Sequence, residues 1–318
     1  MLFVVSDSDD AFAQAKWASS NVRSCSQEER KHRIEQVCEE WRKKGEHKCG
    51  MDRLSNIMVD DKHKTLYCEV PKAACTSWKM FFAELLGNIT DDIRPVLNYK
   101  VHWTGAYEQL GFRFLNTYTP EEQLYRVQHY FKFLTVRNPI ARMVSAYENK
   151  LERQHPDSQW YQKHIGTYII KNYRRNPSME SLEKGHDVTF DELARFIAND
   201  KDKFFQRYDR HWNIEYLTCC PCMIKYDYIA KIETLAEDAK NIIERVVPGE
   251  GKTLPRSNVM NMAEEVSRCQ KPLSTLKQNI VEKLLQHYST DLRIFGYGVD
   301  TERKIFCNSG GEGENACC

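Results

Sequence analysis

Net charge and long apolar stretches are both nearly absent from this sequence. Its 318 residues carry 46 Lys and Arg against 45 Asp and Glu, a formal net charge of +1. So balanced a chain exerts no overall attraction on nucleic acid or an acidic glycan, so any anionic ligand must be drawn by a local group of cations. With 41% hydrophobic and 29% charged residues, the composition is that of a globular protein, not of a disordered or membrane-embedded chain.

A second pair of cysteines with the spacing of a zinc ribbon is also missing. Cys219, Cys220 and Cys222 lie together, but a zinc site of the ribbon type needs another such pair, and Cys269 and Cys307 stand alone. Twelve cysteines favour disulfides and an oxidising compartment, with an intracellular metal site as the alternative.

A complete Walker loop is absent as well. Residues 248–253 imitate the end of one, but the first glycine would fall at Val246, and the segment follows a predicted helix instead of a strand. We therefore reject a nucleotide kinase or GTPase of that type.

The most informative stretch that is present covers residues 66–86. An extended apolar run, residues 66–70, breaks at Pro71, and an amphipathic run then starts at Thr76. This predicts a strand, a tight loop and a helix. N–H groups at a helix start favour an anion, and Lys72 adds a positive charge beside them. The loop is therefore either a phosphate-binding cradle or a Pro-Lys turn with a Thr N-cap that only starts a helix.

A similar unit covers residues 131–147. An apolar strand ends at Arg137, Pro139 marks the break, and a helix follows that carries Ser145 two turns in. In a parallel sheet the carboxyl ends of such strands meet at one edge, where ligands bind. We therefore expect both loops to face one site.

The two units resemble the paired signatures of sulfotransferases that use 3′-phosphoadenosine 5′-phosphosulfate (PAPS). In that family a Pro-Lys-x-x-x-Thr loop holds the 5′-phosphosulfate, and an Arg-x-Pro…Ser segment holds the 3′-phosphate. The resemblance implies that PAPS is the co-substrate, that Arg137 and Ser145 bind it, and that no metal is needed. It also assigns cofactor binding to the segment that we call the cradle: Pro71, Lys72, Ala73, Ala74, Cys75, Thr76, Ser77 and Trp78.

A third block is similar to the branch of Golgi carbohydrate sulfotransferases that includes the chondroitin and dermatan 4-O-sulfotransferases. It comprises residues 209–212, 219–222, 226–228 and 233–235. The resemblance implies an acceptor hydroxyl on a glycosaminoglycan or glycoprotein glycan, most specifically the 4-hydroxyl of N-acetylgalactosamine, and no nucleic-acid partner.

Residue roles follow from the chemistry of sulfuryl transfer. Lys72 suits the charge that develops on the leaving oxygen, and a histidine suits the base that takes the proton of a sugar hydroxyl. The resemblance favours His102, which lies between the two phosphate motifs; His211 is the alternative. Each could also be an ordinary surface or core histidine.

The expected fold is α/β, with a central parallel sheet flanked by helices in the P-loop-like arrangement of PAPS-binding sulfotransferases. We expect three regions: a stem or packing helix in residues 1–59, the sulfotransferase domain in residues 60–300 and a flexible tail in residues 301–318.

The expected compartment is the Golgi lumen, because members of the family are membrane-anchored Golgi proteins. The apolar residues 1–5 are too short for a signal peptide or a membrane span. We therefore expect the printed sequence to be a truncated form or an incomplete gene model. In that compartment Asn88 would be a glycosylation acceptor.

The segment 150–175 mixes cations with aromatic residues. The first interpretation is a solvated helix pair with a buried stripe. The alternative is an acceptor groove, in which aromatic faces stack on sugar rings and cations such as Arg174 and Arg175 meet acidic groups.

Overall fold

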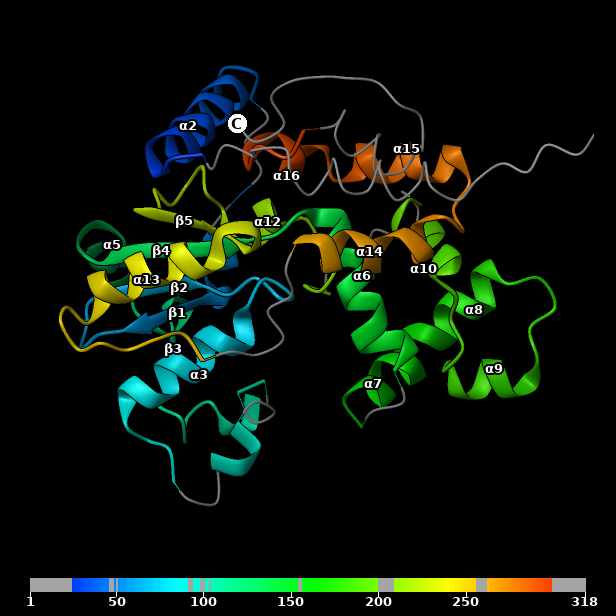
Figure 1. The fold of residues 1–318 in the computed structure, drawn as a ribbon, viewed down its shortest axis with the longest axis horizontal. Coiled ribbons are helices and arrows are strands. Elements are labelled where there is room, and N and C mark those ends of the chain that lie inside the picture. Colours follow the sequence, from blue (N-terminus) through cyan, green and yellow to red (C-terminus); the bar gives the residue numbers. More distant parts are fainter. Residues whose placement is uncertain are drawn as a thin grey trace, which may run out of the picture.

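The computed structural model describes residues 25–45, 49, 51–90, 94–97, 101–102, 104–153, 156–199, 209–255 and 262–298. The tail expected at residues 301–318 lies outside them. A five-stranded sheet with helices on both faces stands beside a second group of helices (Figure 1). The strands are β1 (Ile57–Asp60), β2 (Thr65–Cys68), β3 (Arg113–Phe114), β4 (Phe131–Val136) and β5 (Tyr228–Lys231). The α-helices are α2 (Gln27–Lys43), α3 (Cys75–Leu86), α5 (Pro120–His129), α6 (Pro139–Tyr147), α7 (Pro156–Tyr161), α8 (Thr167–Tyr173), α9 (Met179–Lys184), α10 (Phe190–Ile197), α12 (Glu215–Cys219), α13 (Leu235–Val246), α14 (Met262–Leu273), α15 (Gln278–His287) and α16 (Ser289–Ile294).

The sheet has the strand order β3-β1-β2-β4-β5. Its centre confirms the expected parallel arrangement, because β2 pairs with β4 and β4 with β5 in parallel. The edge is different: β1 runs antiparallel to both β2 and β3. The turn at residues 61–64 explains this, since a connection of that length can close a hairpin but cannot cross over to a parallel strand.

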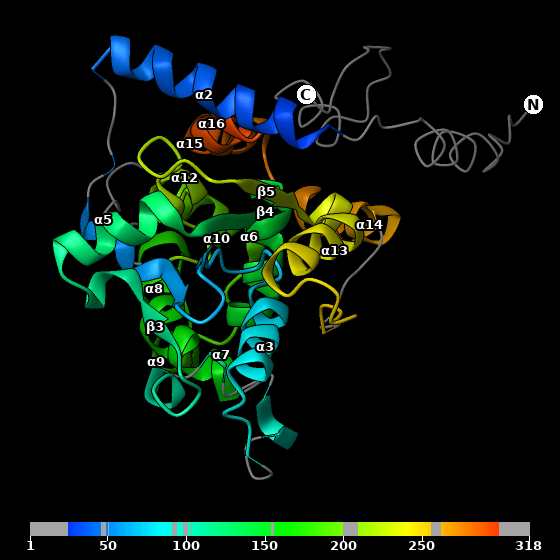
Figure 2. The same ribbon diagram turned by 90° about the vertical axis from the view of Figure 1, so that its left-hand side faces the viewer.

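Side chains alternate between the two faces of the sheet along each strand, and both faces are covered by helices. Leu66, Leu134 and Ile229 face one way, into a cluster with α2, α12 and α16. Tyr67 and Phe133 face the other way, into a cluster with α3 and α13. Figure 2 shows α2 and α16 on one side of the sheet and α3 on the other. Both faces are therefore buried, as expected for a sheet with parallel strands at its centre.

Helix α2 packs on the sheet. Its N-terminus is fixed by a capping box between Ser26 and Glu29. The buried Arg30 then donates to Asp238 at 2.8 Å and to the carbonyl oxygen of Ile229 at 2.8 Å. Of the two expectations for the N-terminal region, the structure supports the packing helix for residues 27–43.

The three neighbouring cysteines Cys219, Cys220 and Cys222, which we call the cysteine block, all form disulfides. Cys219 pairs with Cys68, Cys220 with Cys49 and Cys222 with Cys38. Disulfide formation, favoured over a zinc site by the sequence, is thus confirmed for all three cysteines of the block. These bonds cross-link segments 151 to 184 residues apart, close to the carboxyl end of β2.

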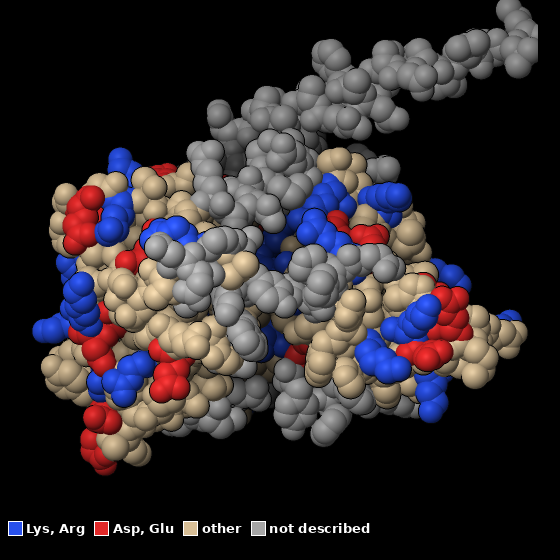
Figure 3. Space-filling view, turned by 90° about the horizontal axis from the view of Figure 1, so that it is seen from below, with Lys and Arg blue, Asp and Glu red and all other residues tan. Residues whose placement is uncertain are grey.

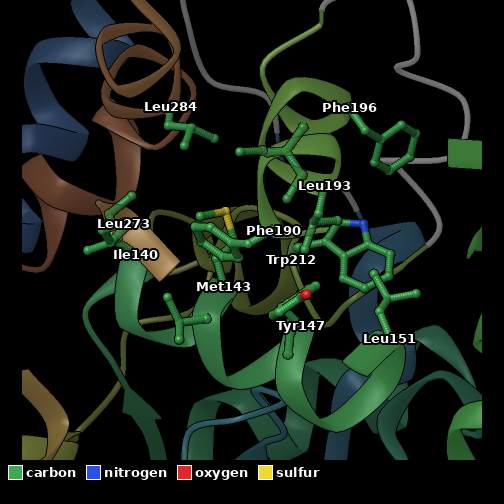
Figure 4. Packing of buried hydrophobic residues seen from close by; sticks show 14 of the residues in the cluster. Ile140, Met143, Tyr147, Leu151, Phe190, Leu193, Phe196, Trp212, Leu273 and Leu284 are labelled. Carbon is green, nitrogen blue, oxygen red and sulfur yellow. The ribbon is translucent and has the colours of Figure 1, made fainter. Parts of the chain in front are cut away.

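The second group of helices has its own core. Ile140, Met143 and Tyr147 of α6 pack against α10 and α15, and Trp212 lies among them (Figure 4). Trp212 is 1% exposed. The helix after Arg137 is therefore held by a large apolar cluster, which fixes the position of the site residues around it. None of the described helices is both long and apolar enough to cross a bilayer.

Candidate active site

The two sequence-predicted loops meet at the carboxyl ends of the neighbouring parallel strands β2 and β4. Cys68 pairs with Leu134, so the chain leaves the sheet at the same edge on its way to α3 and to α6. Lys and Arg side chains lie in the hollow at the centre of the face seen in Figure 3. The sheet edge thus brings together both halves of the expected phosphate site.

The cradle has an unusual backbone. Lys72 and Ala74 adopt left-handed conformations, with φ of 68° and 60°. Such values cost about 1 to 3 kcal/mol each outside glycine and are concentrated at functional sites. Helix α3 begins at Cys75 with Ala74 as a cap that has no side-chain hydrogen bond. Thr76 therefore lies within the first turn of α3 and is not its N-cap, which removes the support for the alternative of a simple Thr-capped turn.

Most side chains of the cradle point into the protein. Five of its eight residues are buried: Pro71, Ala73, Cys75, Ser77 and Trp78. Trp78 is completely buried in the aromatic cluster under α3, where its indole N–H donates to the Thr135 hydroxyl at 2.9 Å. These residues can meet a ligand through the backbone but not through exposed side chains.

Lys72 is the central cation of the site. Its ammonium donates to Oδ1 of Asn149 at 3.1 Å, so its partner is a neutral amide. Burial, and after it the positive charges of Lys150, Arg137 and Arg268, together lower the pKa of Lys72 to about 8. Cations that repel one another in a half-buried site indicate an anionic ligand.

Asn149 and Lys150 lie on a π-helical segment, Glu148–Glu152, directly after α6. A π turn rotates the residues that follow it relative to an α-helix and often occurs at functional sites. Lys150 is the first residue of the segment 150–175 that mixes cations with aromatic residues, whereas Asn149 lies just outside that segment. No local signal in the sequence announces a π turn.

Arg137 supports the cradle directly. Its guanidinium donates to the Lys72 carbonyl oxygen at 3.0 Å, and the residue is 7% exposed. Asn138 then caps α6 by accepting from the backbone N–H groups of Ile140 and Ala141. Ser145 is buried on α6 two turns further on, so its binding role stays a prediction.

His102 lies against the cradle. Its Nε2 atom is 2.7 Å from the Thr76 hydroxyl. The side chain keeps an exposed edge, yet desolvation by the surrounding groups and the positive charge of Lys79 lower the pKa of His102 to about 3. The imidazole is therefore neutral at physiological pH. In this state it can accept a proton, as a general base must.

Below His102 lies a buried ion cluster that the sequence analysis did not identify. Glu69 is 2.7 Å from the Lys79 ammonium and 3.4 Å from the Arg210 guanidinium. Burial alone would raise the pKa of Glu69, but these two cations hold it at about 2. The cluster joins the end of β2 to α3 and to the loop that carries His211.

A metal ion would find one set of donor atoms among the described residues. Ligand atoms of Glu69, Cys75 and His102 all lie within 4.8 Å of one another. Carboxylate, thiol and imidazole are donors that zinc accepts. The Lys79 ammonium, however, already neutralises the carboxylate, and the other cations nearby oppose a further positive charge.

His211 belongs to a different network. Its Nδ1 atom is 2.8 Å from Asp209 Oδ1 and 3.1 Å from the Tyr161 hydroxyl. Burial lowers its pKa, although Asp209 acts in the opposite direction. The Lys150 ammonium lies 4.7 Å from the centre of the Tyr161 ring, which links this network to the cations around Lys72.

Arg174 is part of the protein's own framework. Its guanidinium donates to Glu192 at 2.7 Å and to Asp187 at 2.6 Å. These bonds join the end of α8 to α10 and to the loop between α9 and α10. The solvated-face interpretation therefore fits Arg174 better than a role in an acceptor groove.

The charge state of Lys72 leads to a pH prediction. Because its pKa is about 8 in the free protein, the ammonium is lost as the pH rises through that value. For PAPS, the co-substrate that the resemblance implies, we expect kcat/KM to fall above pH 8, since this parameter reports the ionisation of the free enzyme. Steady-state kinetics across that range would measure it. Lys72→Arg should remove the alkaline limb, and an unchanged limb in that variant would assign the ionisation to another group.

Comparisons with known proteins agree with this geometry. A model described as the sulfotransferase family matches residues 55–298. Carbohydrate sulfotransferase 14 of Danio rerio is 34% identical over 255 residues, covering 80% of this chain and 65% of that protein. Carbohydrate sulfotransferase 11 of Mus musculus is 32% identical over 259 residues, covering 79% and 70%. Carbohydrate sulfotransferase 8 of Homo sapiens is 33% identical over 232 residues, covering 73% and 52%. The matches thus span between 52% and 70% of these relatives. No solved structure matches.

Proposed function

Since the chain belongs to the sulfotransferase family, we propose that it transfers a sulfo group from PAPS to a hydroxyl group of a glycan. The observation that carries the proposal is the group of mutually repelling cations around Lys72, at the start of α3 and the carboxyl ends of β2 and β4. This arrangement suits a ligand with several negative charges and two separated phosphate groups.

In this proposal the cradle binds one phosphate group of PAPS, and the segment that follows β4 binds the other. The first-turn N–H groups of α3 and the Thr76 hydroxyl would hold the 5′-phosphate, while Lys72 lies beside them. Arg137 offers a planar fork for the 3′-phosphate, with Ser145 as its helper. The short link from Arg137 to the Lys72 backbone supports this division, because it fixes the spacing between the two cations.

Transfer forms a bond between the acceptor oxygen and sulfur and breaks the bond between sulfur and the phosphate oxygen. Charge then develops on that phosphate oxygen, where the Lys72 ammonium can neutralise it. The acceptor proton passes to His102, whose neutral ring lies at the Thr76 side of the cradle. The negative charge of the bound PAPS would raise the pKa of His102 and strengthen it as a base.

The finer proposal is that the acceptor is the 4-hydroxyl of N-acetylgalactosamine in chondroitin or dermatan. Its support is the resemblance of residues 209–235 to that branch and the printed names of relatives, which are carbohydrate sulfotransferases. Three disulfides support an oxidising compartment, which we propose to be the Golgi lumen.

A panel of acceptors tests the finer proposal. Labelled sulfate transfer from PAPS would be measured with desulfated chondroitin, desulfated dermatan, desulfated heparin and a neutral oligosaccharide ending in N-acetylgalactosamine. We expect chondroitin or dermatan to be the best acceptor, with label on the 4-hydroxyl after digestion to disaccharides. Preference for the neutral oligosaccharide or for heparin would replace the acceptor and leave the reaction class intact.

A further inference from the structure

Arg268 is a cation of the site to which the proposed reaction gives no role. It lies on α14, which packs against α6 (Figure 1). Cys269, the next residue, and Leu273 lie in the same buried cluster as Ile140 and Met143 of α6. This cluster fixes α14 in place, and the Arg268 side chain beside it keeps 24% of its surface exposed to solvent.

The ion pair of Arg268 places its guanidinium on the same side of α6 as Ser145. The Nε and Nη2 atoms both donate to Oε2 of Glu148. Glu148 follows the last residue of α6 and begins the π-helical segment, three positions after Ser145. Residues three apart on a helix are neighbours on its surface. Arg268 therefore lies near the hydroxyl that is proposed to help bind the 3′-phosphate.

Electrostatic effects connect Arg268 to the other cations of the site. Burial, and after it the positive charge of Arg137, lowers the pKa of Arg268. Arg268 in turn contributes to the lowered pKa of Lys72. Charges shift one another's pKa in this way when they lie close together in a partly buried site. Arg268, Arg137 and Lys72 therefore form one group, although they come from three separate parts of the chain.

The charge of a 3′-phosphate is larger than one arginine can neutralise. A phosphate monoester carries about −1.5 to −2 charges at pH 7. Arg137 supplies one positive charge, and its guanidinium also donates to the Lys72 carbonyl oxygen. The Ser145 hydroxyl supplies a donor but no charge. A second guanidinium would balance the remaining charge and offer further N–H donors to the three phosphate oxygens.

We propose that Arg268 binds the 3′-phosphate by exchanging partners: it pairs with Glu148 in the free protein and with the phosphate in the complex. Glu148 then competes with the nucleotide for one guanidinium, because binding has to break an ion pair. This proposal rests on the proposed function, since it takes PAPS as the co-substrate. It predicts opposite effects on nucleotide affinity for loss of the Arg268 charge and loss of the Glu148 charge.

Calorimetric titration with adenosine 3′,5′-bisphosphate tests the exchange. Arg268→Gln should raise its Kd about tenfold, as expected for loss of one charged hydrogen-bond donor. The affinity for adenosine 5′-phosphate, measured by competition with the bisphosphate, should stay unchanged, because this nucleotide lacks the 3′-phosphate. Thermal unfolding of each variant checks that it is folded.

Arg293→Gln is the matched control. Arg293 of α16 also pairs with a glutamate of another helix, Glu40 of α2. These two helices cover the face of the sheet opposite α3 (Figure 2), so the variant should leave the Kd for the bisphosphate unchanged.

Glu148→Gln is the second test variant. It should lower the Kd for the bisphosphate about threefold, and it should have no effect when Arg268→Gln is also present, since no ion pair is then left to break. An unchanged Kd in Arg268→Gln, an equal loss of affinity for both nucleotides, or weaker binding in Glu148→Gln would overturn the exchange.

Failure of the proposed function would give a different pattern. If the wild-type protein transferred no sulfo group but the Kd values changed as expected, the reaction would be wrong and the phosphate contact would stand. Sulfo transfer by the wild-type protein with an unchanged Kd in Arg268→Gln would remove only the contact. A wild-type protein that bound no bisphosphate would contradict both.

Discussion

Lys72→Ala is expected to lower kcat for sulfo transfer by about 10² to 10³, the usual effect of removing one group that stabilises developing charge. The reason is specific to its position: the ammonium is half-buried, surrounded by other cations and hydrogen-bonded to a neutral amide instead of a carboxylate. Single-turnover transfer at saturating PAPS would measure the chemical step alone.

Two controls separate this role from simple binding. The affinity for adenosine 3′,5′-bisphosphate, which keeps both phosphates but lacks the sulfo group, should weaken far less than kcat falls. Lys252→Ala removes a lysine from the exposed loop after α13 and should leave kcat unchanged. If Lys72→Ala retained near-normal turnover, Lys72 would be no more than an anchor or a surface cation.

His102→Ala is expected to lower kcat by about 10² to 10⁴, the range for loss of a general base. The ring is hydrogen-bonded to the Thr76 hydroxyl at 2.7 Å, which places it at the cradle. PAPS affinity should remain largely intact, because His102 is neutral and the phosphates are assigned to other groups. Calorimetry with adenosine 3′,5′-bisphosphate and turnover assays would be run on the same preparations.

His211→Ala provides the contrast. His211 is oriented by Asp209 through Nδ1, an arrangement that also suits a base. If His102 takes the proton, His211→Ala should mainly raise the acceptor KM through disturbance of Tyr161 and Lys150. Loss of turnover in His211→Ala, with His102→Ala nearly normal, would transfer the role to the Asp209–His211 pair.

The central architecture could be predicted from the sequence because it depends on local patterns. Apolar runs ending at Pro71 and Pro139 identified β2 and β4, and the parallel pairing of those strands brought Lys72 and Arg137 to one edge. The disulfide interpretation of the cysteine block was confirmed for Cys219, Cys220 and Cys222. In each case the signal lies within a few neighbouring residues.

The features that sequence reasoning missed depend on tertiary packing. Thr76 has the chemistry of an N-cap, but the left-handed Ala74, two residues earlier, is the cap of α3. Asn149 is an ordinary polar residue until the π turn after α6 directs it to Lys72. The ion cluster joins Glu69, which follows β2, to residues of α3 and of the loop before α12, and no spacing in the sequence connects them.

The most direct test of the central claim is transfer of labelled sulfate from PAPS to pooled desulfated glycans by the wild-type protein and Lys72→Ala, measured side by side. Transfer that is robust in the wild-type protein and reduced about 10²- to 10³-fold in the variant is the expected result. No transfer by the folded wild-type protein, or equal transfer by both, would contradict a sulfotransferase whose leaving group is neutralised by Lys72.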